Sequence, residues 1–409
     1  MKKFWKTTLA VAMTACMAMS LAACGGSASS SSSSDAPAAE AESGAAEGAI
    51  KIGGSGPLTG PAAVYGNAVK TAAEMAVEEI NAKGGVQFSL QFEDDKHVAE
   101  EAATAYGTLK DGGMQISLAT VTSAPGAAVS PLYQEDQTFA ITPSGSSPSV
   151  IYADGEGMTG AYGNVFQMCF SDPNQGSGSA TYIAAHPDLG SKIAVIYKND
   201  DPYSMGIFNT FKAQAATEGL EIVYEDTFKG EESDFTVQLG KAQAAGADLL
   251  FLPIYYTPAS QILTQADKMG YKPTVFGVDG MDGILGVEGF EPALAEGVYL
   301  LTPFVANAED ELTKTFVENY KARANGEVPN QFAADAYDCI YALAQACENA
   351  GITSDMSNAD ICAAMVEQFT TMTFNGLTGS DMTWNENGEV TKAPKAMIIE
   401  NGEYVPAAE

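Results

Sequence analysis

Two short polar turns hold the residues of this chain that are best suited to binding a small anion. The first, residues 120–126 with the sequence TVTSAPG, follows an apolar run and opens a predicted helix. The second, residues 143–148 with the sequence PSGSSP, follows another such run. Hydroxyl groups and free backbone N–H groups at a helix start favour a carboxylate. Helix capping alone would use the same residue types, so the turns by themselves leave both interpretations open.

Sequence motifs of catalysis are missing. The chain contains no GxSxG, HExxH or GxxxxGK[ST] motif, and the glycines of residues 53–60 lack the GxGxxG spacing. The chain has only two histidines, His97 and His186, and its six cysteines lack CxxC spacing, which argues against a metal site. Paired carboxylates carry little information, because 52 acidic residues make chance pairs common. We therefore expect a binding protein that is not an enzyme, with no metal and no cofactor.

The chain is strongly acidic, with 20 Lys and Arg residues against 52 Asp and Glu residues and a formal net charge of -32. This charge repels both the nucleic-acid backbone and anionic lipid. Its 409 residues suffice for two domains, and a hydrophobic fraction of 46% is typical of globular proteins. Nucleic acid is therefore excluded as a partner, and a membrane association requires a separate anchor.

The N-terminal residues have the order of a secretory signal. Three lysines lie among the first six residues, and residues 7–22 carry no charge. As a helix this uncharged stretch would span about 24 Å, less than the roughly 30 Å of a hydrocarbon core. Residues 21–24, LAAC, resemble the bacterial lipobox, whose cysteine is acylated. We expect a signal peptide over residues 1–23, a lipidated Cys24, and a disordered Ser/Ala-rich tether over residues 24–49.

The remainder of the chain alternates short β-branched or aromatic runs with longer amphipathic stretches. The predicted strands are residues 50–53, 88–92, 115–119, 139–142, 193–197, 221–224, 249–254, 274–278 and 297–302. The predicted helices are residues 64–82, 98–109, 203–216, 235–245, 259–269, 309–324, 332–348 and 358–369. This alternation predicts an α/β fold whose parallel sheets are covered on both faces.

Two sets of strands, from residue 50 to about 145 and from about 190 to 300, predict two lobes. The late helices need a sheet to cover, and the first set has fewer helices of its own. We therefore predict lobe 1 from residues 50–167 plus 303–382 and lobe 2 from residues 168–302 plus 383–409. Asn-Gly pairs at 375–376, 387–388 and 401–402 predict tight turns between short antiparallel strands near the C-terminus.

Long segments of the chain resemble a known family. Residues 54–86, GSGPLTGPAAVYGNAVKTAAEMAVEEINAKGGV, are similar to the opening of the branched-chain amino acid (Leu/Ile/Val) type of ABC-transporter substrate-binding protein. The similarity continues through residues 122–148 and recurs in IAVIYKNDDPYSMG, DLLFLPIYYTPASQIL, TVFGVDGMDG and TWNENGEV. It covers essentially everything after residue 50. The resemblance implies the periplasmic binding protein type 1 fold, in which two Rossmann-like lobes are joined by a multi-strand hinge.

The resemblance also implies a ligand site between the lobes. Ser123 matches the serine that holds the ligand α-carboxylate, and Ser144 and Ser146 match a pair that offers a carbonyl oxygen and a hydroxyl. Asp279 matches the acidic residue that pairs with the α-ammonium, where the family often has glutamate. The aromatic positions of the site correspond to Tyr65, Tyr203, Tyr255 and Phe332. Phe332 replaces the family's tyrosine, which implies a more apolar wall.

These features together predict an extracytoplasmic lipoprotein, lipid-anchored to the outer face of the cell membrane or periplasmic. It would capture an amino acid, branched-chain or otherwise apolar, by lobe closure and deliver it to the transmembrane subunits of an ABC permease. We expect a monomer. Two alternatives remain open: a ligand-sensing receptor module, and a receptor for amide-like, urea-like or aromatic acid solutes, which would not need Asp279 as an ammonium partner.

The cysteines of the folded part predict no disulfide framework. Thr122 stands where familiar members of the family have a half-cystine near the site. Cys339 and Cys347 would be about 12 Å apart on one helix, too far to bridge. We expect buried thiols at Cys169, Cys339, Cys347 and Cys362.

Overall fold

The structure is a computed structural model that describes residues 48–393 and 395–407. The predicted signal peptide, Cys24 and nearly all of the predicted tether lie outside the described residues. All described residues belong to one compact unit, Ala45–Glu409. Among the described helices, none combines the length and apolar character needed to cross a lipid bilayer.

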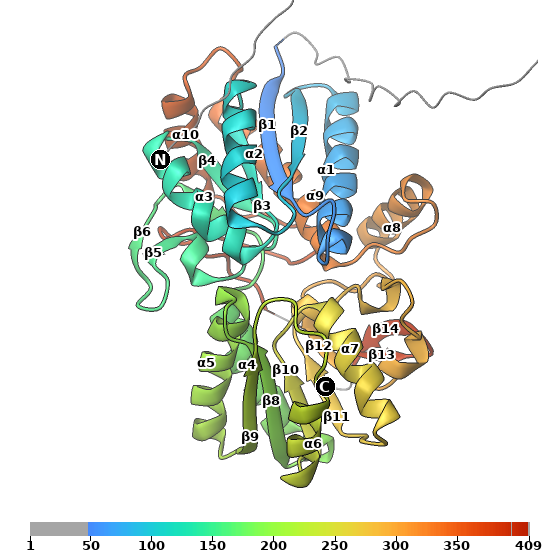
Figure 1. The fold of residues 1–409 in the computed structure, drawn as a ribbon. Coiled ribbons are helices and arrows are strands. Elements are labelled where there is room, and N and C mark those ends of the chain that lie inside the picture. The colour runs from blue at the N-terminus through green and yellow to red at the C-terminus, as the bar shows by residue number, and fades with distance from the viewer. Residues whose placement is uncertain (1–47, 394, 408–409) are drawn as a thin grey trace, which may run out of the picture. The chain divides into compact units, whose positions relative to one another are not determined.

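The first sheet is parallel throughout, with strand order β2-β1-β3-β4-β7 (Figure 1). Its strands are β1 (Ile50–Gly56), β2 (Phe88–Asp94), β3 (Ile116–Thr120), β4 (Phe139–Thr142) and β7 (Val165–Gln167). The connecting helices are α1 (Ala63–Lys83), α2 (Ala99–Asp111) and α3 (Ser123–Glu135). Every residue of β3 and β4 is buried, as expected for central parallel strands covered on both faces.

The second sheet has the order β14-β13-β12-β11-β10-β8-β9. Its parallel strands are β8 (Lys192–Lys198), β9 (Glu221–Phe228), β10 (Leu249–Leu252), β11 (Thr274–Gly277) and β12 (Tyr299–Thr302). The hairpin of β13 (Lys395–Glu400) and β14 (Glu403–Pro406) is added antiparallel at the β12 edge. The helices of this part are α4 (Asp172–Ala185), α5 (Pro202–Glu218), α6 (Thr236–Ala244) and α7 (Tyr256–Lys268).

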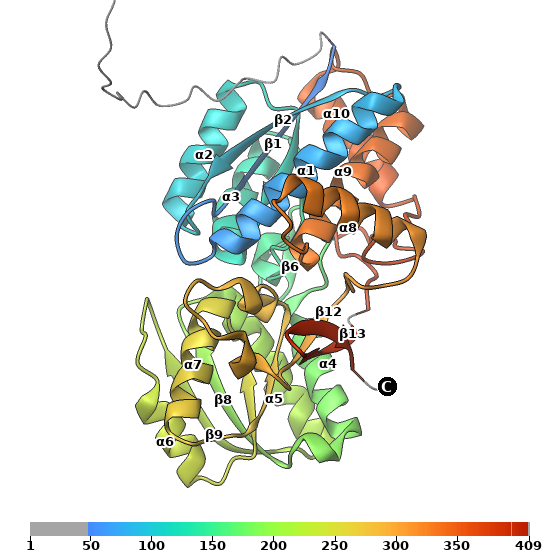
Figure 2. The same cartoon turned by 90° about the vertical axis from the view of Figure 1, so that its right-hand side faces the viewer.

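Three late helices lie against elements of the first sheet (Figure 2). They are α8 (Glu311–Arg323), α9 (Gln331–Ala350) and α10 (Asn358–Phe369). Helices α8 and α9 contact α1, and both α9 and α10 contact β3 and β4. The chain therefore passes between the two sheets three times, after β7, after β12 and before β13.

The fold class is confirmed, and every predicted strand and helix is present, with ends that differ by a few residues. The Asn-Gly turn prediction holds fully only at Asn401, which joins β13 to β14. At the other two pairs the flanking residues form isolated bridges, Phe374 with Met382 and Trp384 with Val390. The four cysteines of the described part are buried and free, as expected.

Several short elements and one helix of the structure are not predicted from the sequence. The missed strands are β7 and the small hairpin of β5 (Tyr152–Asp154) and β6 (Thr159–Ala161). Helix α4 was missed because it contains Gly176 and Gly178 and little apolar periodicity. A start signal is nevertheless present, since Asp172 and Pro173 open the helix after Ser171.

Candidate functional site

The two serine turns predicted from sequence are joined to each other. Ser144 Oγ donates to the carbonyl of Val121 at 2.6 Å, and Ser123 Oγ accepts from the backbone N–H of Ser147 at 3.2 Å. Thr142 supports both turns, because its Oγ1 donates to the Thr120 carbonyl at 2.7 Å and accepts from Gly145 N at 2.8 Å. The carboxyl ends of β3 and β4 thus present one continuous polar surface.

The hydroxyl of Ser146 differs from the others in having no hydrogen-bond partner among the described residues, although the residue is fully buried. Ser144 has already committed its hydroxyl to Val121. A ligand at this turn could therefore use the hydroxyl of Ser146 and backbone groups of the turn.

The four predicted aromatic residues form one cluster. The rings of Tyr203 and Tyr255 stack with centroids 4.7 Å apart, and Tyr65 meets Tyr255 edge-on at 5.5 Å. Phe332 lies 4.3 Å from Tyr65, again between ring centroids. Tyr256, which the sequence did not single out, also packs edge-on against Tyr65 at 4.8 Å. The cluster draws residues from α1, α5, α7 and α9 and the loop before α7, and so from elements of both sheets.

Asp279 joins this aromatic cluster at the end of β11. The carboxylate is 2% exposed and accepts the phenolic hydrogen of Tyr203, with 2.5 Å between Tyr203 Oη and Asp279 Oδ1. Burial raises the pKa of Asp279 to about 7, and the hydrogen bond from Tyr203 offsets only part of this shift. Tyr65 Oη also donates to the carbonyl of the neighbouring Gly280. The carboxyl group of Asp279 is therefore buried, has a pKa near neutral pH, and accepts a hydrogen bond from an aromatic hydroxyl.

Asp172, which the sequence does not single out, lies between the serine turns and Asp279, bonded to the first and interacting electrostatically with the second. Its backbone N–H donates to the carbonyl of Ser146 at 3.0 Å, and its side chain is fully buried. Neither carboxylate oxygen has a hydrogen-bond partner of normal geometry among the described residues. Burial raises the pKa of Asp172 well above its usual value, and the charges of Asp279 and Asp201 raise it further, while Ser146 lies near enough to lower it.

Two further polar groups share this environment on helix α4. Gln175 Oε1 accepts from the backbone N–H of Asp279 at 3.2 Å. Gln175 Nε2 has no acceptor of normal geometry in the described part of the chain, although the Gln175 side chain lies near enough to the Asp279 carboxyl group to lower its pKa. The Ser179 hydroxyl, one helical turn further along, also lacks a partner within residues 48–393 and 395–407. Buried polar atoms are normally paired. The first turns of α4 therefore hold unused hydrogen-bonding capacity beside Asp279.

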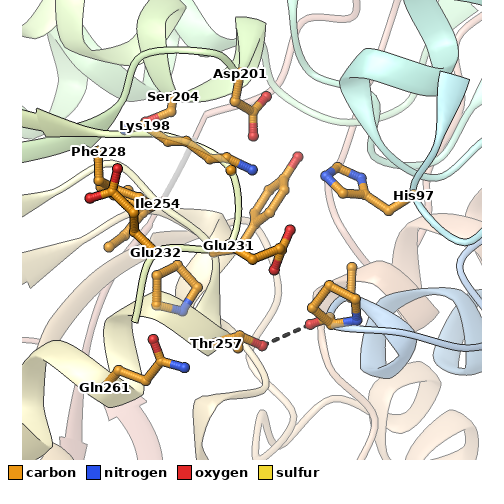
Figure 3. Close-up of a pocket in the computed structure, with 15 residues that line it drawn as sticks. His97, Lys198, Asp201, Ser204, Phe228, Glu231, Glu232, Ile254, Thr257 and Gln261 are labelled. Atoms are coloured by element: carbon orange, nitrogen blue, oxygen red, sulfur yellow. Dashed lines mark hydrogen bonds between the residues drawn. The ribbon is translucent and has the colours of Figure 1, made fainter. Parts of the chain in front are cut away.

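A small cavity of about 60 Å³ opens beside Tyr255. Figure 3 shows the side chains of His97, Lys198, Asp201 and Glu231 directed toward one space. His97 Nδ1 lies 2.9 Å from Thr122 Oγ1, and the imidazole ring packs edge-on against Tyr255. Burial, with the nearby Lys198 charge, lowers the pKa of His97 to about 4, so the ring is neutral at physiological pH. This cavity adds a polar flank to the aromatic cluster.

The site residues predicted from sequence thus form two groups, one of serines and one of aromatics with Asp279. The structure links them through Ser146 and Asp172. What the sequence did not reveal is Asp172, Gln175, His97 and Tyr256. One local signal was available in the sequence, since Asp172 stands at a helix start. The positive φ of His97, 62°, is rare for a non-glycine residue but is seen only in the structure.

The comparisons with known proteins agree with this fold. The sequence model of the family described as "Periplasmic binding protein" matches residues 49–402. The Leu/Ile/Val-binding protein homolog 3 of Brucella melitensis is 27% identical over 319 residues, covering 76% of this chain and 82% of the relative.

Two solved structures are also similar. The leucine binding protein LivK from Thermotoga maritima has a TM-score of 0.76 at 26% identity, covering 88% of this chain and 98% of its own. The branched-chain amino acid transporter substrate binding protein LivJ from Streptococcus pneumoniae, solved with isoleucine, has a TM-score of 0.76 at 27% identity, covering 88% and 100%. With a family match across nearly the whole described part, this chain belongs to the periplasmic binding protein family.

Proposed function

We propose that this protein is the extracytoplasmic solute receptor of an ABC importer and that it captures an amino acid, branched-chain or otherwise apolar. The observation that carries the proposal is the fully buried carboxyl group of Asp172, which makes no hydrogen bond of normal geometry among the described residues. Ser146 and Ser147 lie near it, and it interacts electrostatically with the buried Asp279. In the ligand-free protein burial raises the pKa of both carboxyl groups, because their ionised forms are costly to bury without a partner. An ammonium group placed between them would pair with the ionised forms and remove that cost.

The α-carboxylate, at the opposite pole of an amino acid from the ammonium group, fits the serine turns. A ligand carboxylate at Ser123 would lie at the N-terminus of α3, a helix of 13 residues, where free backbone N–H groups and the helix dipole favour an anion. The unpartnered hydroxyl of Ser146 is available to the same carboxylate or to the ammonium. Because Ser146 contacts Asp172, the two poles lie side by side, as the α-carboxylate and α-ammonium do in an amino acid.

The side chain of the ligand would meet the aromatic cluster of Tyr65, Tyr255 and Phe332. These rings are apolar on their faces, and the hydroxyl of Tyr65 is already committed to the carbonyl of Gly280. An apolar side chain would displace no strong polar contact here. The names of the similar proteins, which bind Leu, Ile and Val, support the same ligand class.

Capture would require the two sheets to move apart and close, since the ligand groups come from elements on both. Ligand binding would then favour the closed arrangement through contacts made only there. We retain lobe 1 (50–167 plus 303–382) and lobe 2 (168–302 plus 383–409) as a proposal. Trp384 Nε1 donates to the carbonyl of Gln167 at 2.8 Å, which favours a last crossing nearer residue 390.

The remaining parts of the proposal concern location and partners. We propose that Cys24 carries a lipid anchor, that residues 24–49 tether the folded part to the outer face of the membrane, and that the receptor acts as a monomer. Its partner would be the transmembrane subunits of the permease.

A thermal-shift screen of the purified protein against the twenty amino acids, urea, short amides and benzoate tests the ligand class, with calorimetry on the hits. A ligand at 100 times its Kd stabilises a protein by about 2.7 kcal/mol, which gives a clear shift. We expect responses to Leu, Ile, Val or a similar apolar amino acid. A response confined to compounds without an ammonium group would overturn the site chemistry.

A further inference from the structure

The first turn of α9 contacts the segment that carries Asp279, although the two belong to different sheets. Helix α9 packs against α1, β3 and β4 of the first sheet. Asp279 and Asp282 follow β11 of the second sheet. Gln331 is the first residue of α9, next to Phe332 of the aromatic cluster. Any separation of the two sheets must therefore break or move this contact.

Gln331 makes two hydrogen bonds to that segment. Its side-chain Nε2 donates to the main-chain carbonyl of Asp279 at 3.2 Å, and its backbone N–H donates to Asp282 Oδ2 at 2.8 Å. All three residues are buried, with exposed fractions of 1% for Gln331, 2% for Asp279 and 6% for Asp282. Neither contact is a surface contact that water could replace without rearrangement.

The side chain of Asp282, which follows β11 of the second sheet, caps the N-terminus of α9. The first N–H groups of a helix have no partner inside the helix. The side chain of Asn330 accepts from Ala333 N at 3.1 Å, which leaves the N–H of Gln331 for another acceptor. The carboxylate of Asp282 supplies it and also lies at the positive end of the helix dipole. This is a helix cap contributed by a different lobe.

The bond to the Asp279 carbonyl bears on the orientation of the Asp279 side chain. The Asp279 carbonyl also accepts from the backbone N–H of Asp282 at 2.9 Å, and Tyr203 Oη accepts from Gly280 N at 2.8 Å. The peptide between Asp279 and Gly280 is thus held on both sides, and its carboxylate is directed to Tyr203. The bond from Gln331 is the one of these three contacts that comes from a helix packed on the first sheet. Removing the Gln331 amide would break it.

We propose that Gln331 and Asp282 form a clamp between the lobes that positions Asp279 as they close. The positioning role rests on the proposed function, whereas the effect of the clamp on closure does not depend on the identity of the ligand. Gln331 and Asp282 are positioning residues, since they act through Asp279 and the helix start and not through a ligand contact.

The experiment compares wild type with Gln331→Ala, Asp282→Ala and Asp282→Asn. Small-angle X-ray scattering without ligand reports the separation of the lobes, and calorimetry with L-leucine or another amino acid identified by the screen reports affinity. We expect Gln331→Ala and Asp282→Ala to increase the radius of gyration of the ligand-free protein and to weaken affinity about fivefold to thirtyfold, the effect of losing one or two hydrogen bonds. Asp282→Asn keeps an acceptor oxygen and should recover much of the closed arrangement.

Gln345→Ala is a matched control on the same helix. Its side-chain Nε2 donates to the carbonyl of Thr373 at 2.9 Å, within the part packed on the first sheet, and the bond is exposed. This variant should leave both measurements unchanged. A ligand-free radius of gyration equal to wild type in Gln331→Ala and Asp282→Ala, with folding verified by circular dichroism, would overturn the clamp. If no amino acid binds, the proposed function fails while the scattering comparison still decides the clamp.

Discussion

Tyr203 donates its phenolic hydrogen to Asp279, and both side chains are 2% exposed. Tyr203 Oη also accepts from the backbone N–H of Gly280 at 2.8 Å. The hydroxyl therefore connects the aromatic cluster to the carboxyl group proposed as the ammonium partner. Tyr203, one of the predicted aromatic residues of the site, therefore makes hydrogen bonds as well as packing contacts.

The first prediction concerns this pair. We expect Asp279→Ala to weaken amino-acid binding at least about tenfold, because a buried ammonium loses a charged acceptor. Tyr203→Phe should have a smaller effect in the same direction, since it frees the carboxylate but removes its orienting donor. Calorimetry measures both, with the exposed Asp188→Ala as control. Unchanged affinity in Asp279→Ala would refute the assignment.

Asp172→Asn should separate stability from binding. The substitution removes a buried carboxyl group that makes no hydrogen bond of normal geometry among the described residues, so we expect the ligand-free protein to melt at a higher temperature near pH 8. Affinity for the amino acid should fall about tenfold, because one of two ammonium acceptors loses its charge. Scanning calorimetry and titration calorimetry measure the two effects. Weaker binding together with a lower melting temperature would indicate a structural role only.

The pH dependence of stability follows from the raised pKa values. Burial raises the pKa of Asp279 to about 7 and those of Asp282 and Asp335 to about 6. Between their ordinary values near 4 and these values, the native state holds protons that the unfolded state has released. The stability that these groups contribute is therefore lost as pH rises through about 6 to 7. Thermal melts of the ligand-free protein should show a melting temperature that falls from about pH 4.5 to about pH 7, with no further contribution from these groups above that.

Ligand affinity should respond to pH in the opposite direction. An ammonium partner must be ionised, so binding to a protonated Asp279 requires loss of its proton. Affinity should therefore rise from about pH 5.5 to about 7.5, by at most about tenfold per unit for one proton. Titration calorimetry in two buffers would also show proton release. Affinity that does not vary over this range would argue against Asp279, and Asp279→Asn should reduce the pH dependence.

Lys392 and Asp335 form a buried ion pair at the last crossing between the sheets. Lys392 Nζ lies 2.6 Å from Asp335 Oδ1 and also donates to Thr378 Oγ1 at 2.6 Å, with side-chain exposures of 0% for Lys392 and 2% for Asp335. Lys392→Met should destabilise the fold by about 3–5 kcal/mol, because it leaves a buried carboxylate uncompensated. Urea denaturation measures this.

Two variants control that measurement. Combining Lys392→Met with Asp335→Leu should recover part of the lost stability, because the carboxylate that pairs directly with Lys392 is removed. The buried Asp338 also loses the nearby Lys392 charge but keeps its hydrogen bonds from Leu377 and Thr378. Lys272→Met breaks an exposed pair with Asp267, whose side-chain exposures are 79% and 51%, and should have little effect. An equal loss of stability in Lys392→Met and Lys272→Met would contradict the expectation that burial of the ion pair decides the effect.

The lipid anchor is tested by Cys24→Ser in the native host. The mature chain is strongly acidic, so electrostatic attraction to anionic lipid cannot replace the acyl group. We expect the variant protein to leave the membrane fraction and to appear in the soluble extracytoplasmic fraction, as judged by fractionation and immunoblotting. Full retention in the membrane fraction would contradict the anchor.

The candidate site was partly predictable from sequence. Ser123 and Ser144 could be found because they follow β3 and β4 directly, and the carboxyl ends of neighbouring parallel strands meet at one edge of a sheet. Asp279 was found through the family resemblance, since its position after β11 alone does not distinguish it from the many other carboxylates. Asp172 was missed together with α4, whose glycines conceal the helical pattern.

The sequence by itself determined the elements and their α/β order, because apolar spacing, glycine stops and strand composition act between residues close in the chain. It also determined the strong negative charge. Only the tertiary structure decided that Asp172, Asp279 and Gln331 come together and are buried. Desolvation and hydrogen-bond pairing depend on what covers a side chain, and here the covering elements come from distant segments of the chain. The raised pKa of Asp279 and the cap of α9 by Asp282 are consequences of packing that no local pattern encodes.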